Sequence, residues 1–124
     1  MMPNVIRMSP DGDPINGLTP GKFAGPALDQ EPVEARYNFF DAPRDNVVKV
    51  RASVYEGSAY SEKVEDYPFD EIMFIISGIA TITNEDGTVE EFGPGECFFM
   101  PMGFNGIWKQ SDNLKKFAML AHRG

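Results

Sequence analysis

The chain has 124 residues, enough for one domain with a single hydrophobic core. Its net charge of −8, from 19 acidic and 11 basic residues, argues against nucleic acid or an anionic membrane as a partner, since both attract clustered Lys and Arg. The single cysteine, Cys97, excludes an intramolecular disulfide, and we see neither a secretory signal nor an apolar membrane span. We therefore expect a soluble cytoplasmic protein.

Proline and glycine dominate the first third of the chain. Seven of the ten prolines lie within residues 1–44. Proline breaks helices and is excluded from central strands, so no regular element is expected there. We predict that residues 1–44 form an extended arm that packs on the rest of the protein or on a partner subunit, with a mobile tail as the alternative.

Residues 45–124 have the pattern of short strands. Apolar and polar residues alternate along Val48–Tyr55, which is typical of a half-buried strand, whereas the continuous apolar run Ile72–Ile76 predicts a strand covered on both faces. Asn84–Gly87 predicts a tight turn, and Cys97 falls in an apolar strand, where we expect a buried, unreactive thiol. Further strands are predicted at Ala80–Thr83, Val89–Phe92, Glu96–Met100, Gly106–Gln110 and Lys116–Ala121. No helical periodicity is visible, so the pattern predicts an all-β sandwich or barrel.

Two glycine-punctuated motifs add a family resemblance. Glu71 stands seven positions before Gly78, and the sequence from Gly95 through Pro101 to Gly103 reads G-x5-P-x-G. These motifs resemble those of the cupin superfamily (RmlC-like), and the sequence is most similar to its small ethanolamine-utilisation and ureidoglycine-aminohydrolase-type members. The resemblance implies a single-domain double-stranded β-helix, or jelly-roll barrel, over residues 45–124.

Most cupins hold a metal ion with three histidines and a glutamate inside the barrel. The resemblance places Glu65, Tyr67, Glu71 and Gly106 at those four positions. Three nitrogen ligands are missing, so we predict no His-rich metal site and no cofactor. A hard divalent cation held by Glu65, Glu71 and water is the alternative, because such ions prefer oxygen ligands.

The same alignment predicts candidate catalytic residues. If Glu65, Tyr67 and Glu71 project into one cavity, two carboxylates in a low dielectric would form an acid/base pair with Tyr67 as a proton donor. The alternative is that Glu71 forms a structural ion pair with Arg51 or Lys116.

Candidate ligand-binding residues are Arg51, Tyr55, Trp108 and Lys116. Arg51 and Tyr55 share one strand face, which faces either solvent or the barrel interior. An interior Arg51 would favour a ligand with a carboxylate or phosphate. Trp108 either fills the core or forms an aromatic wall against the ligand.

Two functional hypotheses remain open at this point. The first is a small cupin that binds a small polar metabolite in its barrel. The alternative is a metal-independent isomerase, dehydratase or lyase that uses Glu71, Glu65 and Tyr67. An open interior would favour the enzyme, and an interior plugged by Trp108, Phe74 and Met100 would contradict it. Since small cupins commonly dimerise, we also predict a homodimer.

Overall fold

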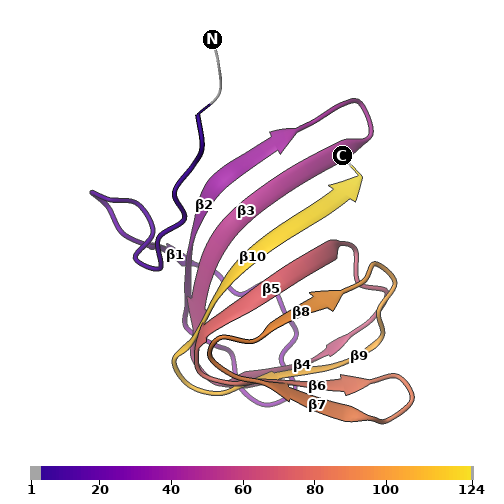
Figure 1. The fold of residues 1–124 in the computed structure, drawn as a ribbon. Coiled ribbons are helices and arrows are strands. Elements are labelled where there is room, and N and C mark those ends of the chain that lie inside the picture. Colours follow the sequence, from indigo (N-terminus) through magenta and orange to yellow (C-terminus); the bar gives the residue numbers. More distant parts are fainter. Residues whose placement is uncertain (1–3, 124) are drawn as a thin grey trace.

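The computed structural model describes residues 4–123, which form ten strands in two antiparallel sheets (Figure 1). The strands are β1 (Thr19–Gly21), β2 (Glu34–Pro43), β3 (Val48–Gly57), β4 (Tyr60–Val64), β5 (Asp70–Ser77), β6 (Ala80–Asn84), β7 (Val89–Phe92), β8 (Cys97–Met100), β9 (Gly106–Gln110) and β10 (Leu114–Arg123). One sheet has the order β1-β2-β3-β10-β5-β8 and the other the order β4-β9-β6-β7. The sheets face each other and come closest at the left of the view in Figure 1.

The fold is the all-β jelly roll that the sequence predicts. All seven strands predicted after residue 45 are present, as β3 and β5 to β10. Strands distant in sequence lie side by side, since β10 pairs with both β3 and β5. Within residues 4–123, no helix exists that could cross a membrane.

The N-terminal third contributes more to the barrel than predicted. Residues 34–43 form β2, which pairs antiparallel with β3 from Glu34↔Gly57 to Pro43↔Lys49. The only proline within this stretch stands at its last position, so the backbone donors needed for pairing are intact. The boundary predicted between residues 44 and 45 therefore separates two strands of one sheet.

The segment before β2 lies against the barrel. Lys115 Nζ donates a hydrogen bond to the carbonyl oxygen of Pro10 at 2.9 Å. The ring of Phe23 packs edge-on against Tyr60, with the two centroids 5.1 Å apart. A contact of this segment with a partner subunit stays a prediction.

The core lies between the sheets and is set by the alternation of side chains. Met73 and Ile75 on β5 are fully buried, whereas Ile72 and Phe74 are 44% and 40% exposed on the outer face. The prediction that both faces of this strand are covered is therefore wrong for the single chain. Cys97, which pairs with Phe74 on the same outer face, is exposed, so the predicted buried thiol is wrong as well. The predicted homodimer stays a prediction.

Candidate functional site

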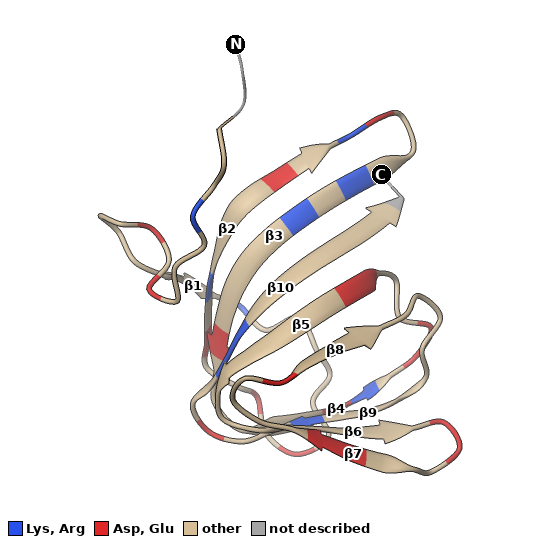
Figure 2. Cartoon of the chain, viewed as in Figure 1, with Lys and Arg blue, Asp and Glu red and all other residues tan. Residues whose placement is uncertain are grey.

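A cavity of about 190 Å³ lies between the two sheets. Its walls carry acidic and basic groups in equal number. They are Glu34 and Arg36 from β2, Arg51 from β3, Glu62 from β4, Glu71 from β5 and Lys116 from β10. Figure 2 shows charges of both signs along β2 and β3, two of the strands that wall the cavity. A cavity of mixed charge inside an otherwise apolar barrel is a candidate binding site.

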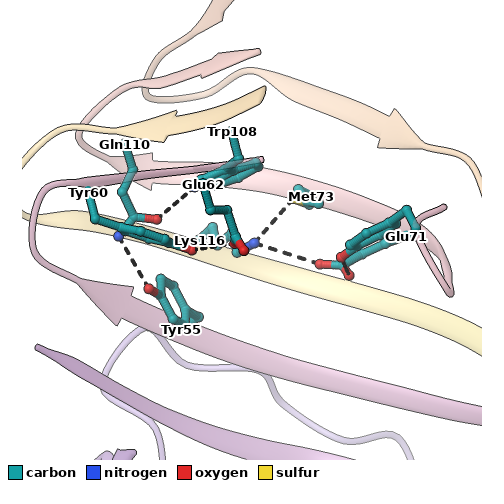
Figure 3. A network of polar contacts seen from close by, with 9 residues as sticks. Tyr55, Tyr60, Glu62, Glu71, Met73, Trp108, Gln110 and Lys116 are labelled. Atoms are coloured by element: carbon teal, nitrogen blue, oxygen red, sulfur yellow. Dashed lines mark hydrogen bonds and ion pairs between the residues drawn. The ribbon is translucent and has the colours of Figure 1, made fainter. Parts of the chain in front are cut away.

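Glu71 belongs to a network of polar contacts inside the cavity (Figure 3). The hydroxyl of Tyr67 donates to Glu71 Oε1 at 2.6 Å, and Lys116 Nζ lies 3.7 Å from Glu71 Oε2. The side chains of Lys116 and Glu71 are only 13% and 6% exposed. Of the two cations that the sequence offers as ion-pair partners of Glu71, Lys116 rather than Arg51 forms the pair.

The Lys116 amine lies among apolar groups apart from this carboxylate. Its Nζ is 3.2 Å from Met73 Sδ, 4.6 Å from the Trp108 ring centroid and 5.3 Å from that of Tyr55. Burial lowers the pKa of Lys116 below its ordinary value, and the negative charge of Glu71 opposes that shift. The aromatic faces stabilise the protonated form as well.

A second hydrogen-bonded chain fixes the aromatic wall beside Lys116. Trp108 Nε1 donates to Gln110 Oε1 at 2.9 Å, and Gln110 Nε2 donates to the Tyr55 hydroxyl and to the Ser58 carbonyl oxygen. Because each buried polar atom in this chain has a partner, Trp108 is held in one orientation. It is buried in the core, as one of the two alternatives predicts, and it also lines the cavity. A contact of Trp108 with a ligand stays a prediction.

The tyrosines of the cavity stay protonated at neutral pH. Burial and then the charge of Glu71 raise the pKa of Tyr67 far above its ordinary value. Burial likewise raises the pKa of Tyr60, whose hydroxyl donates to Glu62 Oε1 at 2.8 Å. Both residues therefore act as hydrogen-bond donors to carboxylates.

Arg51 differs from the other charged groups of the cavity. Its Nε atom is buried and has no hydrogen-bond partner among residues 4–123. Its guanidinium lies over the Phe69 ring, with the ring centroid 5.8 Å from Arg51 Cζ. A buried donor without an acceptor is costly, so this guanidinium is suited to an anion that enters the cavity.

The comparisons with known proteins agree with this architecture. The family model described as "EutQ-like cupin domain" matches residues 49–118, more than half of the chain. The chain belongs to this cupin family. No curated protein matches the sequence.

Solved structures resemble this cupin in fold. A Pseudomonas syringae protein of unknown function has a TM-score of 0.76 and 21% identity, covering 88% of this chain and 46% of its own. The polyketide cyclase RemF from Streptomyces resistomycificus has a TM-score of 0.62 and 16% identity. The match covers 99% of this chain and 80% of RemF. The Clostridium difficile EutQ protein has a TM-score of 0.54 and 16% identity. The match covers 79% of this chain and 74% of the EutQ protein. This cupin thus spans about half the length of the Pseudomonas protein.

Glu65 does not lie in the cavity of this cupin, contrary to the prediction. Its side chain is 72% exposed and pairs with Lys63 at 3.5 Å. Glu62 and Val64 on β4 face inward, so Glu65, which follows Val64, faces outward. The left-handed turn at Asp66, with φ of 48°, then brings Tyr67 back into the cavity. A cation shared by Glu65 and Glu71 therefore has no geometric support.

The metal ion implied by the cupin family does not fit the residues at its four positions. Glu65 faces solvent, Gly106 has no side chain, and Tyr67 and Glu71 are hydrogen-bonded to each other. Among residues 4–123, no cluster of three or more His, Cys, Asp or Glu side chains has a geometry that could hold a metal ion. The donor set at these positions lacks the nitrogen and sulfur ligands that transition metals prefer.

Gly106, where the family has a histidine, also leaves no room for a side chain. A Cβ there would overlap the carbonyl oxygen of Thr83 and approach Phe104 Cζ to 2.6 Å. We expect Gly106→Ala to lower the free energy of unfolding by about 1–3 kcal/mol, measured by urea denaturation. Gly93→Ala is the matched control, because its Cβ would meet nothing closer than 3.8 Å. Equal stability of both variants would contradict this steric assignment.

Six of the seven predicted site residues line the cavity, and Glu65 is the exception. Sequence reasoning missed Glu34 and Arg36, since β2 was assigned to the arm, and it missed Glu62. The alternation of Tyr60, Glu62 and Val64 was the signal that could have identified Glu62, because residues two apart on a strand face the same side.

Proposed function

We propose that this cupin binds a small metabolite carrying a carboxylate in its barrel, without a His-rich metal site. The observation that carries the proposal is the buried Nε of Arg51, which lines the cavity and has no hydrogen-bond partner within residues 4–123. A carboxylate matches the planar donor geometry of a guanidinium.

The other charges of the cavity support the assignment to Arg51. Glu71 is engaged by Lys116 and Tyr67, and Glu62 by Tyr60. The other arginine of the cavity, Arg36, lies over the Tyr55 ring, with the ring centroid 5.5 Å from its Cζ. The cavity volume of about 190 Å³ is below the roughly 300–1,000 Å³ typical of sites for drug-sized ligands. The ligand is therefore a metabolite of few heavy atoms, in which one carboxylate is a large part of the molecule.

Replacing Arg51 by glutamine tests this proposal. We expect pyruvate to bind to the native protein and pyruvamide, its uncharged analogue, to bind at least about tenfold more weakly. A hydrogen bond to a charged group contributes about 1.5–3 kcal/mol, so Arg51→Gln should weaken pyruvate binding at least about tenfold and abolish the preference over the amide. Isothermal titration calorimetry measures the dissociation constants of pyruvate and of pyruvamide for both proteins.

Lys49→Gln is the matched control for charge. Lys49 lies two positions before Arg51 on β3, and it pairs with Asp41 at 3.3 Å without lining the cavity. The control should bind pyruvate like the native protein. An equal loss of pyruvate affinity in both variants would show that only the net charge of the protein matters, which contradicts a specific role of Arg51. Unchanged pyruvate binding by Arg51→Gln would overturn the proposal.

The metal content of the purified protein is a separate expectation. Because the donor set lacks histidines and Glu65 faces solvent, we expect far less than one equivalent of transition metal per chain. Plasma mass spectrometry on protein purified without chelator or added metal measures it. One equivalent that survives dialysis would contradict the metal-free site.

The second candidate function is a metal-independent isomerase, dehydratase or lyase. The favouring observation is the 2.6 Å hydrogen bond between Tyr67 and Glu71 in a cavity that Trp108 and Met100 line without filling. Phe74, which the sequence offered as a plug, faces the outside. A carboxylate with a protonated phenol beside it is suited to moving a proton on a bound metabolite.

A further inference from the structure

The amine of Lys116 has an environment unlike that of a surface lysine. It is buried, borders the cavity and meets one carboxylate, while its other neighbours are a thioether and two aromatic rings. Burying this ion pair adds little to the stability of the fold, because the cost of removing both charges from water offsets their attraction. A desolvated lysine beside a proton acceptor is the arrangement of an amine nucleophile.

We propose that Lys116 forms an imine with the carbonyl group of a small oxo acid, with Glu71 as the proton acceptor and donor. The inference rests on the proposed function, because the carboxylate of the oxo acid must first bind Arg51.

The reaction needs no group beyond those in the cavity and the substrate. The Lys116 ammonium gives a proton to the Glu71 carboxylate, and its nitrogen attacks the carbonyl carbon as the carbonyl electron pair moves to oxygen. The nitrogen then loses a second proton and the oxygen gains one, which gives a carbinolamine. Glu71 protonates the hydroxyl, the C–O bond breaks, water leaves, and the nitrogen lone pair forms the C=N bond of an iminium ion.

Several groups around Lys116 favour its uncharged form or assist the transfer. Burial lowers the pKa of the amine, with the charge of Arg36 acting in the same direction, while Glu71 and Glu34 oppose the shift. Tyr67 holds the accepting carboxylate in place through its hydrogen bond to Oε1, which leaves Oε2 facing the amine.

Reductive trapping tests the inference. The folded protein is incubated at neutral pH with pyruvate and sodium cyanoborohydride, which reduces an iminium to a stable secondary amine, and the adduct is located by peptide mass spectrometry. We expect labelling of Lys116 at least about tenfold faster than of the exposed Lys109, because the carboxylate held by Arg51 keeps the carbonyl carbon beside the amine. Lys116→Arg keeps the positive charge next to Glu71 but cannot form the adduct, so the fast labelling should disappear.

Two results separate this inference from the proposed function. If pyruvate binds in a manner that depends on Arg51 but Lys116 is labelled no faster than Lys109, the imine is wrong and the binding function stands. If pyruvate neither binds nor labels Lys116, both are wrong. If Lys116 is labelled fast and Arg51→Gln slows that labelling, the result supports both the imine and the binding function. Acetone is the control without a carboxylate, and it should label Lys116 no faster than Lys109.

Discussion

Replacing Lys116 by methionine should lower the free energy of unfolding by about 3–5 kcal/mol. The substitution fills a similar volume and suits the apolar neighbours Met73 and Trp108. It leaves the Glu71 carboxylate, 6% exposed, without its positive partner and with only the Tyr67 hydroxyl as a donor. Removing one member of a buried ion pair costs far more than the pair contributes, because the remaining charge is desolvated without compensation. Urea denaturation at pH 7 measures the change.

The double variant Lys116→Met with Glu71→Gln identifies the cause of that loss. A neutral amide in place of the carboxylate removes the uncompensated charge, so the double variant should be more stable than Lys116→Met alone. Lys63→Met is the surface control. Its partner Glu65 is 72% exposed, so that change should alter stability by about 0.5 kcal/mol or less. A Lys116→Met protein as stable as the native chain would show that water reaches Glu71 freely.

The sequence was a good guide to the strands after residue 45 and a poor one before it. Alternation of apolar and polar residues and the glycines of the motifs predicted β3 and β5 to β10. Gly78 illustrates why: with φ of 76°, a side chain there would bring its Cβ to 2.8 Å from the Leu114 backbone. The β2 strand was missed because the prolines that precede it suggested an irregular arm, although only Pro43 lies within it. After residue 45, β4 was missed as well.

The predicted site residues that line the cavity all lie on regular strands, except Tyr67, which precedes β5. Alternation put Arg51 and Tyr55 on one face of β3 but left open whether that face is interior, and Lys116 on β10 came from the family resemblance; all three line the cavity. Glu65 follows the last residue of β4, and the turn at Asp66 ends the alternation on which its placement relied. The pairing of Glu71 with Lys116 rather than Arg51 depends on side-chain reach across the cavity, which strand periodicity does not encode.

The ion pair and the unpartnered Arg51 together suggest how the site divides its tasks. Lys116 and Glu71 neutralise each other, so neither attracts a charged ligand strongly. In the proposed function, it is Arg51, whose buried Nε has no hydrogen-bond partner within residues 4–123, that binds the anion. A ligand held there brings its remaining atoms toward the carboxylate, the amine and the Tyr67 phenol. Binding and proton transfer are thereby assigned to different residues of one small cavity.

Glu71→Gln should slow proton transfer on a bound metabolite by about 10²–10⁴-fold, because the amide cannot accept a proton. The measurable reaction is exchange of the methyl protons of pyruvate in D2O, followed by NMR. Glutamine has nearly the shape of glutamate and can still accept the hydrogen bond from Tyr67, so pyruvate affinity should change much less than the exchange rate. A parallel loss of affinity and rate would make Glu71 a binding residue rather than a base.

Two control variants sharpen the assignment of the base. Glu65→Gln removes the carboxylate that the sequence proposed as a second member of the pair, yet it lies on the surface and should leave the exchange rate unchanged. Lys116→Arg separates two routes: exchange that survives it needs only Glu71 acting on the bound oxo acid, whereas exchange that it abolishes passes through the imine. If Glu71→Gln exchanges protons at the native rate, the acid/base function is wrong, and the cavity serves binding alone.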